Sequence, residues 1–200
     1  ELQHTMLFNK FLENRIDWLN INLKGLFSSG IMRVQYMYKN VEWLLKFYRG
    51  EKLIIWAHNF HIRKGQTWLT KLLRLKNVGY SLQKTMREEC FTIGLYAGSG
   101  HVASPYRNEI EIQLHNKHHL EKICNEISEQ SVFLPLIEKK FSTKKWVLLE
   151  SSFNTNLPKR IVPQKHYDAI ICLKNVRLPK FLVKKDNELF RQINYSYKEN

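Results

Sequence analysis

The sequence predicts an α/β domain, in which helices pack on a sheet, and three observations carry this prediction. Apolar residues recur at helical spacing in residues 5–20 and 30–49. Short apolar runs such as residues 52–57 and 169–173 have the length and the residue types of strands. The two patterns alternate along a chain whose 200 residues, 44% of them hydrophobic, are enough to bury a core. We therefore expect one domain that spans the whole chain, with a tail at residues 180–200.

Two helices are predicted at the start of the chain. The second helix, residues 30–49, follows Ser28 and Ser29, which favour a helix start, and precedes Gly50, which favours a helix end. The first helix lies near residues 5–20. Its apolar stripe consists of Leu7, Phe8, Phe11, Leu12, Ile16 and Leu19.

A buried strand is predicted to follow at residues 52–57, where the chain reads Lys-Leu-Ile-Ile-Trp-Ala. Because large aromatic residues are usually well buried, we expect Trp56 of this run, like Trp43 before it, in the core. Residues 62–78 then form a basic connection, which has room for a short helix or a lid.

The second half of the chain continues the alternation of strands and helices. Residues 132–137 contain Pro135, which favours an edge strand or an irregular segment because proline cannot donate a backbone hydrogen bond. No periodic pattern continues beyond residue 180. The predicted strands are residues 91–96, 110–114, 146–149 and 169–173, and the predicted helices are residues 81–89 and 120–127.

The chain is strongly basic, since 32 Lys and Arg residues against 18 Asp and Glu residues give a formal net charge of +14. Such a charge makes nucleic acid a candidate partner. The basic residues are scattered as short pairs, such as Lys139-Lys140, and are not interleaved with aromatic residues as in a stacking platform. Nucleic-acid binding is therefore the least favoured function. No apolar run reaches the length of a membrane-spanning helix.

The three cysteines, Cys90, Cys124 and Cys172, are expected to be buried free thiols. They lie among apolar residues, and their spacing matches neither a disulfide framework nor a redox or zinc motif. An odd number of unpaired cysteines favours a reducing compartment, so we expect a cytoplasmic protein.

Polar residues follow the predicted strand 52–57 directly, as His58, Asn59 and His61. In open α/β sheets, ligands bind outside the carboxyl ends of strands, so these residues lie where a site would be built. Two imidazoles can exchange protons near neutral pH. They share one pocket only if the backbone turns at Asn59 and Phe60, because His58 and His61 of an extended chain point to opposite faces. The alternative is that one of them is a hydrogen-bonded structural histidine.

A metal site is the other use of histidine to consider. A catalytic zinc site needs three protein ligands and an open position. His115, His118 and His119 form a second local cluster, but they lie at a polar helix start where solvent exposure is the ordinary explanation. We expect no metal and no other cofactor.

Four motifs occur in an order that resembles one known family. They are the stretch from Arg33 to Leu45, then Trp56-Ala57-His58-Asn59-Phe60-His61, then Gly79-Tyr80-Ser81-Leu82-Gln83, and finally Tyr167-Asp168-Ala169-Ile170-Ile171-Cys172. This order resembles the erythromycin esterase family, including its succinoglycan-biosynthesis-type relatives. The resemblance covers about residues 25–175 and corresponds to the C-terminal half of a family member.

The resemblance implies a metal-independent hydrolase that opens an ester, with a macrolide lactone as the named substrate and antibiotic response as the setting. It implies that His58, His61 and Arg33 are catalytic residues. Arg33 would face the same cleft as the histidines and hold a carboxylate or an oxyanion. It further implies substrate-binding roles for Asn59 and Asn40.

The chain departs from the family in two places. The family's general-base histidine lies in an N-terminal motif like Gly-Glu-x-Thr-His-Gly, which nothing in residues 1–30 matches. The similar Gly98-Ser99-Gly100-His101 lies after the histidine motif and not before it. The family's Arg-Asp pair is replaced by Arg33-Val34. We therefore expect an incomplete esterase-like domain that is weak or inactive alone.

An incomplete domain has consequences for partners. It leaves a sheet edge or an apolar face uncovered, which we expect near residues 52–57 or 91–96. A missing N-terminal half or a second copy of the chain would cover it. Besides a hydrolase acting on a small-molecule ester or macrolide, a noncatalytic binding module that keeps the pocket residues is the alternative function.

Overall fold

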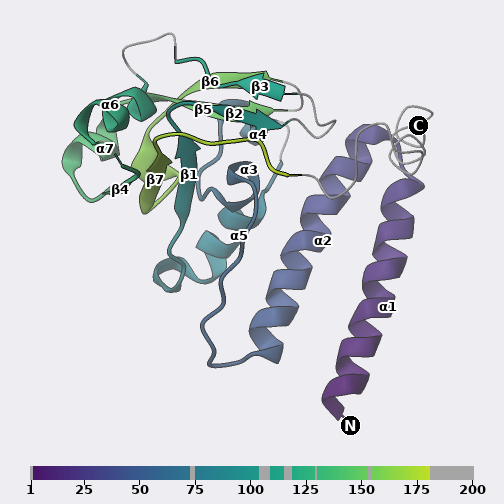
Figure 1. The fold of residues 1–200 in the computed structure, drawn as a ribbon. Helices are drawn as coiled ribbons and strands as arrows, with labels where there is room; N and C mark the ends of the chain where they lie inside the picture. Colours follow the sequence, from purple (N-terminus) through teal and green to yellow (C-terminus); the bar gives the residue numbers. More distant parts are fainter. Residues whose placement is uncertain are drawn as a thin grey trace.

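The fold consists of a helical hairpin beside an α/β unit, as the computed structural model shows (Figure 1). The hairpin is formed by α1 (Leu2–Asn22) and α2 (Leu26–Phe47), which run side by side on the right of the figure, away from the strands. After α2 the chain combines short helices with strands in mixed sheets, which confirms the predicted α/β class. The structure describes residues 2–72, 75–103, 109–114, 119–128, 130–152 and 155–180, so the predicted tail lies outside the described residues.

Helix α1 contains no buried residue, although its sequence carries the predicted apolar stripe. Helix α2 begins after Gly25, whose backbone is extended, so Ser28 and Ser29 lie inside the first turns and do not cap the helix. Gly50 has a φ of +90°, a conformation that glycine adopts readily, and it closes the turn after α2 as the sequence suggests.

The predicted strand at residues 52–57 is wrong, because these residues form a link with no regular structure. A strand needs a neighbouring strand for its backbone hydrogen bonds, and no described residue supplies one here. The placement of Trp56 in the core is wrong as well, since its side chain is 85% exposed. Trp43 is half-buried and stacks on Phe47, with ring centroids 4.7 Å apart.

Short helices follow this link, and the one at Trp68–Leu72 lies in the connection at residues 62–78, where the sequence left room for a short helix or a lid. They are α3 (Asn59–Ile62), α4 (Trp68–Leu72), α5 (Val78–Thr85) and the 3₁₀ turn η1 (Arg87–Glu89). Helix α5 packs on α2 through a small apolar core that contains Val41, Val78 and Leu82. This contact places α3, which packs on α5, between the hairpin and the sheet.

The central sheet has three strands in the order β1, β7 and β4. Strand β1 (Ile93–Ala97) runs parallel to β7 (Ala169–Leu173), and β4 (Val132–Pro135) runs antiparallel to β7. Strand β4 is an edge strand, as Pro135 predicted. Strand β1 forms the other edge of this sheet.

Two helices and a strand hairpin pack on one face of this sheet, namely α6 (Leu120–Ile127), α7 (Lys139–Thr143) and the hairpin of β5 (Trp146–Ser152) and β6 (Thr155–Ile161). The smaller pieces are the pair of β2 (His101–Ala103) and β3 (Glu109–Glu111) and the 3₁₀ turn η2 (Pro163–Lys165). Strand β6 escaped prediction because its residues are largely polar and include Pro158. The core between these elements and the sheet consists of Tyr96, Leu120, Cys124, Leu136, Phe141, Leu148, Ile161, Tyr167, Ile170 and Cys172.

The opposite face of the sheet is left partly open. The strand register places Leu95, Ile171 and Phe133 in one row across the three strands. Leu95 is 37% exposed and Phe133 is 54% exposed. The expectation of an uncovered apolar surface near residues 52–57 or 91–96 is confirmed by Trp56 and Leu95. No helix within the described part of the chain has the length and apolar character needed to cross a membrane.

Candidate active site

His58 caps the N-terminus of α3. Its Nδ1 atom accepts a hydrogen bond of 3.2 Å from the backbone N–H of Phe60. Because an imidazole nitrogen accepts only without a proton, this bond selects the neutral tautomer that carries its proton on Nε2. The position is also a correction, since the sequence predicted His58 at the carboxyl end of a strand. The turn of α3 replaces that strand end and bends the chain at Asn59 and Phe60.

His61 lies at the next turn of α3 and is half-buried. Burial lowers the pKa of His61 below its ordinary value, the positive charge of Arg33 lowers it further, and His58 adds to this effect when its own imidazole is protonated. Its ring stands edge-on to Phe60, with centroids 5.3 Å apart. The Nδ1 atom is enclosed and has no hydrogen-bond partner among the described residues. His61 therefore offers a neutral imidazole at neutral pH.

Arg33 approaches the histidines from α2. Its side chain is exposed, yet it is close enough to His61 for its charge to lower the pKa of that histidine. Asn40 lies seven residues further along the same helix, which is about two turns and thus the same face. The Asn40 side-chain oxygen is enclosed and has no hydrogen-bond partner among the described residues. His58 and His61 thus lie on one turn, Arg33 lies within range of charge interaction with His61, and Asn40 is on the same side of α2 as Arg33.

Asn59 attaches α3 to the central sheet. Its Nδ2 donates to the backbone oxygen of Leu95 at 2.7 Å, and its Oδ1 accepts from the Leu95 N–H at 3.0 Å. The side-chain amide pairs with the free edge of β1 as a backbone peptide would. Both polar atoms of Asn59 are therefore engaged in holding the histidines against the sheet.

Helix α5 supports α3 from the other side. Asn77 donates from Nδ2 to the backbone oxygen of Phe60 at 2.8 Å, while its Oδ1 caps α5 by accepting from the N–H of Tyr80 at 2.8 Å. A Cβ on Gly79 would lie 1.8 Å from the backbone oxygen of Ile62. Only glycine fits at this contact, which explains the glycine of the Gly79-Tyr80-Ser81-Leu82-Gln83 motif.

A partly buried ion pair joins the chain after α3 to the start of β7. Lys64 Nζ lies 2.5 Å from Asp168 Oδ1, and Asp168 Oδ2 accepts from the Thr92 N–H at 2.8 Å. Arg63 is 1% exposed, with its guanidinium 4.9 Å from the centre of the Phe60 ring. Sequence reasoning missed these supports, because Arg63 and Lys64 looked like the start of a basic loop. Asp168 was found only through the Tyr167-Asp168 motif.

Neither the thiols nor His119 extends this site. Cys124 and Cys172 are buried free thiols in the core, and Cys90 is half-buried. His119 is buried beside Glu121, with its Nδ1 3.6 Å from Oε2, while His115 and His118 lie outside the described residues. Within the described ranges, no group of three His, Cys, Asp or Glu side chains is arranged to hold a metal ion.

A separate groove of about 480 Å³ lies between α2 and α5. None of its lining residues is a candidate site residue, so it does not mark the position of the histidines. It is lined by Glu42, Leu45, Lys46, Arg49, Leu82, Thr85 and Met86.

The chain is similar to longer proteins, and it covers only part of the length of each. YbfO of Bacillus subtilis (strain 168), which is named as an inferred hydrolase, is 24% identical over 166 residues, covering 78% of this chain and 37% of YbfO. A solved succinoglycan biosynthesis protein has a TM-score of 0.65 and 19% identity, covering 80% of this chain and 42% of that protein. A mutant of the erythromycin esterase EreC in its open conformation has a TM-score of 0.52 and 15% identity, covering 80% and 39%.

These structural likenesses show the fold, and the chain spans about two fifths of the length of the proteins that it matches. The family assignment rests on sequence. Residues 18–176, which include α2, the histidines of α3 and all strands of the central sheet, match the family described as erythromycin esterase. The chain therefore belongs to the erythromycin esterase family.

Proposed function

We propose that this chain is part of a hydrolase that opens carboxylic esters, with macrolide lactones as the substrate class and antibiotic response as the setting. The observation that carries the proposal is the gathering of His58, His61 and Arg33 around α3. Family membership and the inferred hydrolase YbfO support it. The absence of disulfide spacing among the cysteines supports a cytoplasmic location.

The proposed chemistry divides between the imidazoles and the guanidinium. His61 is neutral because its pKa is lowered. It therefore accepts a proton from the attacking water or orients this water. His58 presents an Nε2–H once its Nδ1 is engaged by Phe60. Arg33 stabilises the oxyanion that forms when water adds to the ester carbonyl. Asn59 positions the histidines through Leu95, and Asn40 offers an amide to the substrate.

The isolated chain is expected to be slow. No segment of its 200 residues matches the motif that the resemblance assigns to the general base. Loss of a general base removes about a hundredfold to ten-thousandfold of rate. We therefore expect the chain to hydrolyse erythromycin more slowly than a complete family member by about that factor.

A ring-opening assay by mass spectrometry tests the proposal. The purified chain is expected to open erythromycin slowly but above background, and His58→Ala or His61→Ala is expected to abolish this rate. His101→Ala, at an exposed histidine of β2, is the matched control and should keep it. A wild-type rate equal to background would contradict hydrolysis by these residues. Robust turnover lost in either variant would instead show that this chain carries a complete site.

The alternative is a noncatalytic module that keeps the pocket, which the absence of the base motif favours. It predicts saturable binding of erythromycin in calorimetry without any ring opening. Arg33→Gln would weaken that binding, whereas Lys39→Gln, on the same helix, would leave it unchanged.

A further inference from the structure

The groove between α2 and α5 lies outside the candidate active site, and its volume of about 480 Å³ is typical of a small-molecule site. Residues three and four apart in a helix share a face, and residues spaced in this way form each wall. One wall comes from α2 and the turn after it, and the other comes from α5 and its C-cap. The first consists of Glu42, Leu45, Lys46 and Arg49, and the second of Leu82, Thr85 and Met86.

The middle of the groove is apolar. Leu82 is buried in the small core between the two helices, while Leu45 and Met86 pack against this core and are only half-buried. Part of their apolar surface is therefore open to a ligand. A hydrocarbon group that covers this surface removes it from water, which favours binding.

Charge is unevenly distributed along the groove. Lys46 and Arg49 are exposed, and the side chain of neither has an ion-pair or hydrogen-bond partner among the described residues. Glu42 is the acidic residue of the lining, and its carboxylate accepts a hydrogen bond from the Tyr38 hydroxyl. Seven residues separate Glu42 from Arg49, which is about 10 Å along a helix. One end of the groove thus offers two cations to an anion, and the acid at the other end is already engaged.

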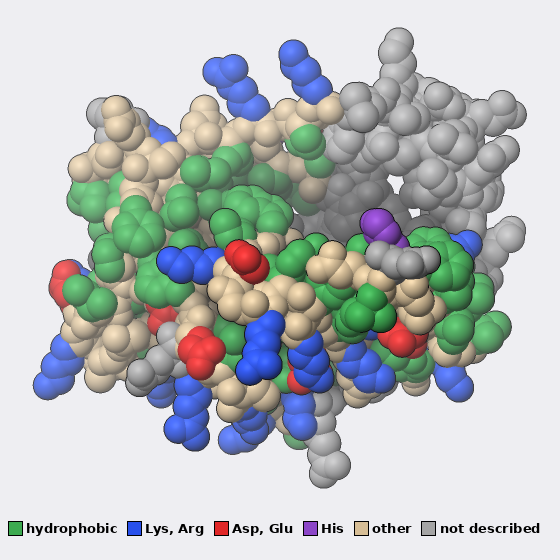
Figure 2. Space-filling model, turned by 90° about the horizontal axis from the view of Figure 1, so that it is seen from below, with side chains coloured by type: hydrophobic (Ala, Val, Ile, Leu, Met, Phe, Trp, Pro, Cys, Tyr) green, Lys and Arg blue, Asp and Glu red, His purple; other side chains and the backbone are tan. Residues whose placement is uncertain are grey.

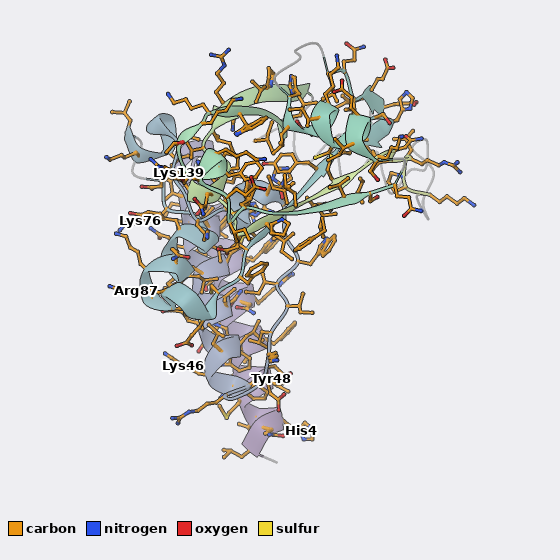
Figure 3. The ribbon with its side chains drawn as sticks, turned by 90° about the vertical axis from the view of Figure 1, so that its left-hand side faces the viewer. His4, Lys46, Tyr48, Lys76, Arg87 and Lys139 are labelled. Carbon is orange, nitrogen blue, oxygen red and sulfur yellow. The ribbon has the colours of Figure 1, made fainter. Side chains whose placement is uncertain are left out.

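The cationic end of the groove faces outward. Helix α2 ends low in Figure 1, and Figure 3 shows Lys46 near this end and Arg87, just after α5, on the same edge of the molecule. Figure 2 shows the underside, where Lys and Arg side chains gather along the lower half with hydrophobic side chains among them. An anion that approaches from this side meets a positive potential.

Arg87 has an unusual backbone conformation beside the groove. It follows Met86, the C-cap of α5, and its φ is +41°. Helices favour glycine at this position, because the left-handed conformation crowds a Cβ. An arginine here lowers stability, and strained positions of this kind cluster at functional sites. The third cation therefore supports a binding role for this side of the molecule.

We propose that the groove binds a free carboxylic acid with a hydrocarbon chain of medium length. The carboxylate lies between Lys46 and Arg49, whose guanidinium has the geometry to donate two parallel hydrogen bonds. The hydrocarbon chain covers Leu45 and Met86 and points towards the Glu42 end. The inference goes beyond the proposed function, since no candidate active-site residue lines the groove.

Titration calorimetry of the full chain with decanoate at low salt tests the inference. Saturable binding of one decanoate per chain is expected, with a shift of the Met86 methyl signal in NMR spectra. Two other probes separate head group from chain. Decyltrimethylammonium has the same chain with the opposite charge, and butyrate has the same head group with a short chain. Each is expected to bind about tenfold or more weakly than decanoate.

The double substitution Lys46→Gln with Arg49→Gln removes both contacts to the carboxylate and is expected to weaken decanoate binding about tenfold or more. Lys39→Gln with Lys52→Gln is the matched control. It removes the same charge from exposed positions outside the groove and should keep the affinity. Met86→Gln keeps the side-chain length but replaces apolar surface, and it is expected to weaken binding about threefold or more.

Arg87→Gly distinguishes a role in binding from a role in folding. It is expected to raise the melting temperature, because glycine adopts a positive φ without strain, and to weaken decanoate binding about threefold through the lost charge. Decanoate binding that does not saturate, equal binding of decyltrimethylammonium, or equal losses in the two double variants would each overturn the inference.

Discussion

His61 shows how single residues of the site modify one another. The ring is half-buried on α3, the Arg33 guanidinium places a positive charge nearby, and His58 adds another when it is protonated. All three effects disfavour the imidazolium, so they lower the pKa of His61 in the same direction. The result is an imidazole that is ready to accept a proton at a pH where an exposed histidine is already partly protonated.

Arg33→Gln is expected to raise the pKa of His61 towards its ordinary value, because it removes one of the nearby positive charges. The pH titration of the His61 ring protons by NMR measures this directly. Lys39→Gln removes a charge from the same helix and is the control. An unchanged His61 titration in Arg33→Gln would mean that the two side chains do not share a site in solution.

Glu121 is a second residue whose ionisation depends on the fold. It is 1% exposed, and one carboxylate oxygen accepts from the Leu149 N–H at 2.6 Å. Burial raises the pKa of Glu121 from 4.5 to about 7, against the opposing effect of the Leu149 N–H. The folded state thus binds a proton that the unfolded chain has already released at intermediate pH.

The stability that Glu121 adds is fully present below pH 4.5 and is lost as the pH rises through about 7. At about 1.4 kcal/mol for each pKa unit, this loss is about 3 kcal/mol. Glu121→Gln keeps an oxygen for Leu149 and is expected to remove this dependence, so the variant should be the more stable protein above pH 7. Urea unfolding at pH 5 and pH 8 measures it, with the exposed Glu126→Gln as control. Parallel pH dependence in Glu121→Gln and wild type would contradict the assignment.

Among elements, α3 and α5 meet at a contact that has no room for a side chain on Gly79. Gly79→Ala places a Cβ 1.8 Å from the Ile62 backbone oxygen, which cannot move without shifting α3. We expect a loss of about 2 kcal/mol or more in thermal or urea unfolding. Gly30→Ala is the matched control, since nothing lies within 4 Å of its Cβ inside α2, and it should gain up to about 1 kcal/mol. Equal effects of the two substitutions would show that the helices are not this close.

The elements that sequence reasoning found are those whose pattern is local. Helix α6 and strand β7 begin and end at the predicted residues. A helical stripe and a continuous apolar run can each be recognised within one segment, without knowledge of the rest of the fold. The error at residues 52–57 has a different origin. Their residues do favour a strand, but a strand exists only when a partner pairs with it, and a pattern in one segment does not contain its partner.

The candidate site likewise contains residues that the sequence predicted and contacts that it did not. The motif supplied His58, Asn59 and His61, and the approach of Arg33 followed from the resemblance. The Asn59 pairing with Leu95 and the Lys64 contact with Asp168 could not be predicted, because they join residues 36 and 104 positions apart. Such contacts depend on the packing of α3 against the sheet and leave no periodic trace in the sequence.

At the scale of the whole molecule, charge and exposed apolar surface oppose each other. Helix α1 exposes Phe8, Phe11 and Ile16, each by more than half, which favours association. The net charge of +14 keeps copies apart while solvent ions are dilute. The state of association should therefore depend on ionic strength.

Raising the salt concentration from about 0.05 M to about 0.5 M is expected to promote self-association, because screening shortens the range of repulsion several-fold. Light scattering at fixed protein concentration measures the mean mass. The double substitution Phe11→Lys with Ile16→Lys should abolish the increase, and Lys24→Gln should not. A mass independent of salt would show that the exposed face of α1 does not associate.

The side chain of Asn59 has a consequence for aggregation. An unpaired edge such as that of β1 invites the same edge of another molecule to add on, which is how ordered aggregates begin. Since Leu95 is the middle residue of this five-residue strand and its N–H and C=O are both held by the Asn59 amide, a foreign strand finds no uninterrupted row of donors and acceptors. The Asn59 side chain thus opposes the addition of a foreign strand to the edge of β1. This protection against ordered aggregation does not depend on the role of the neighbouring histidines.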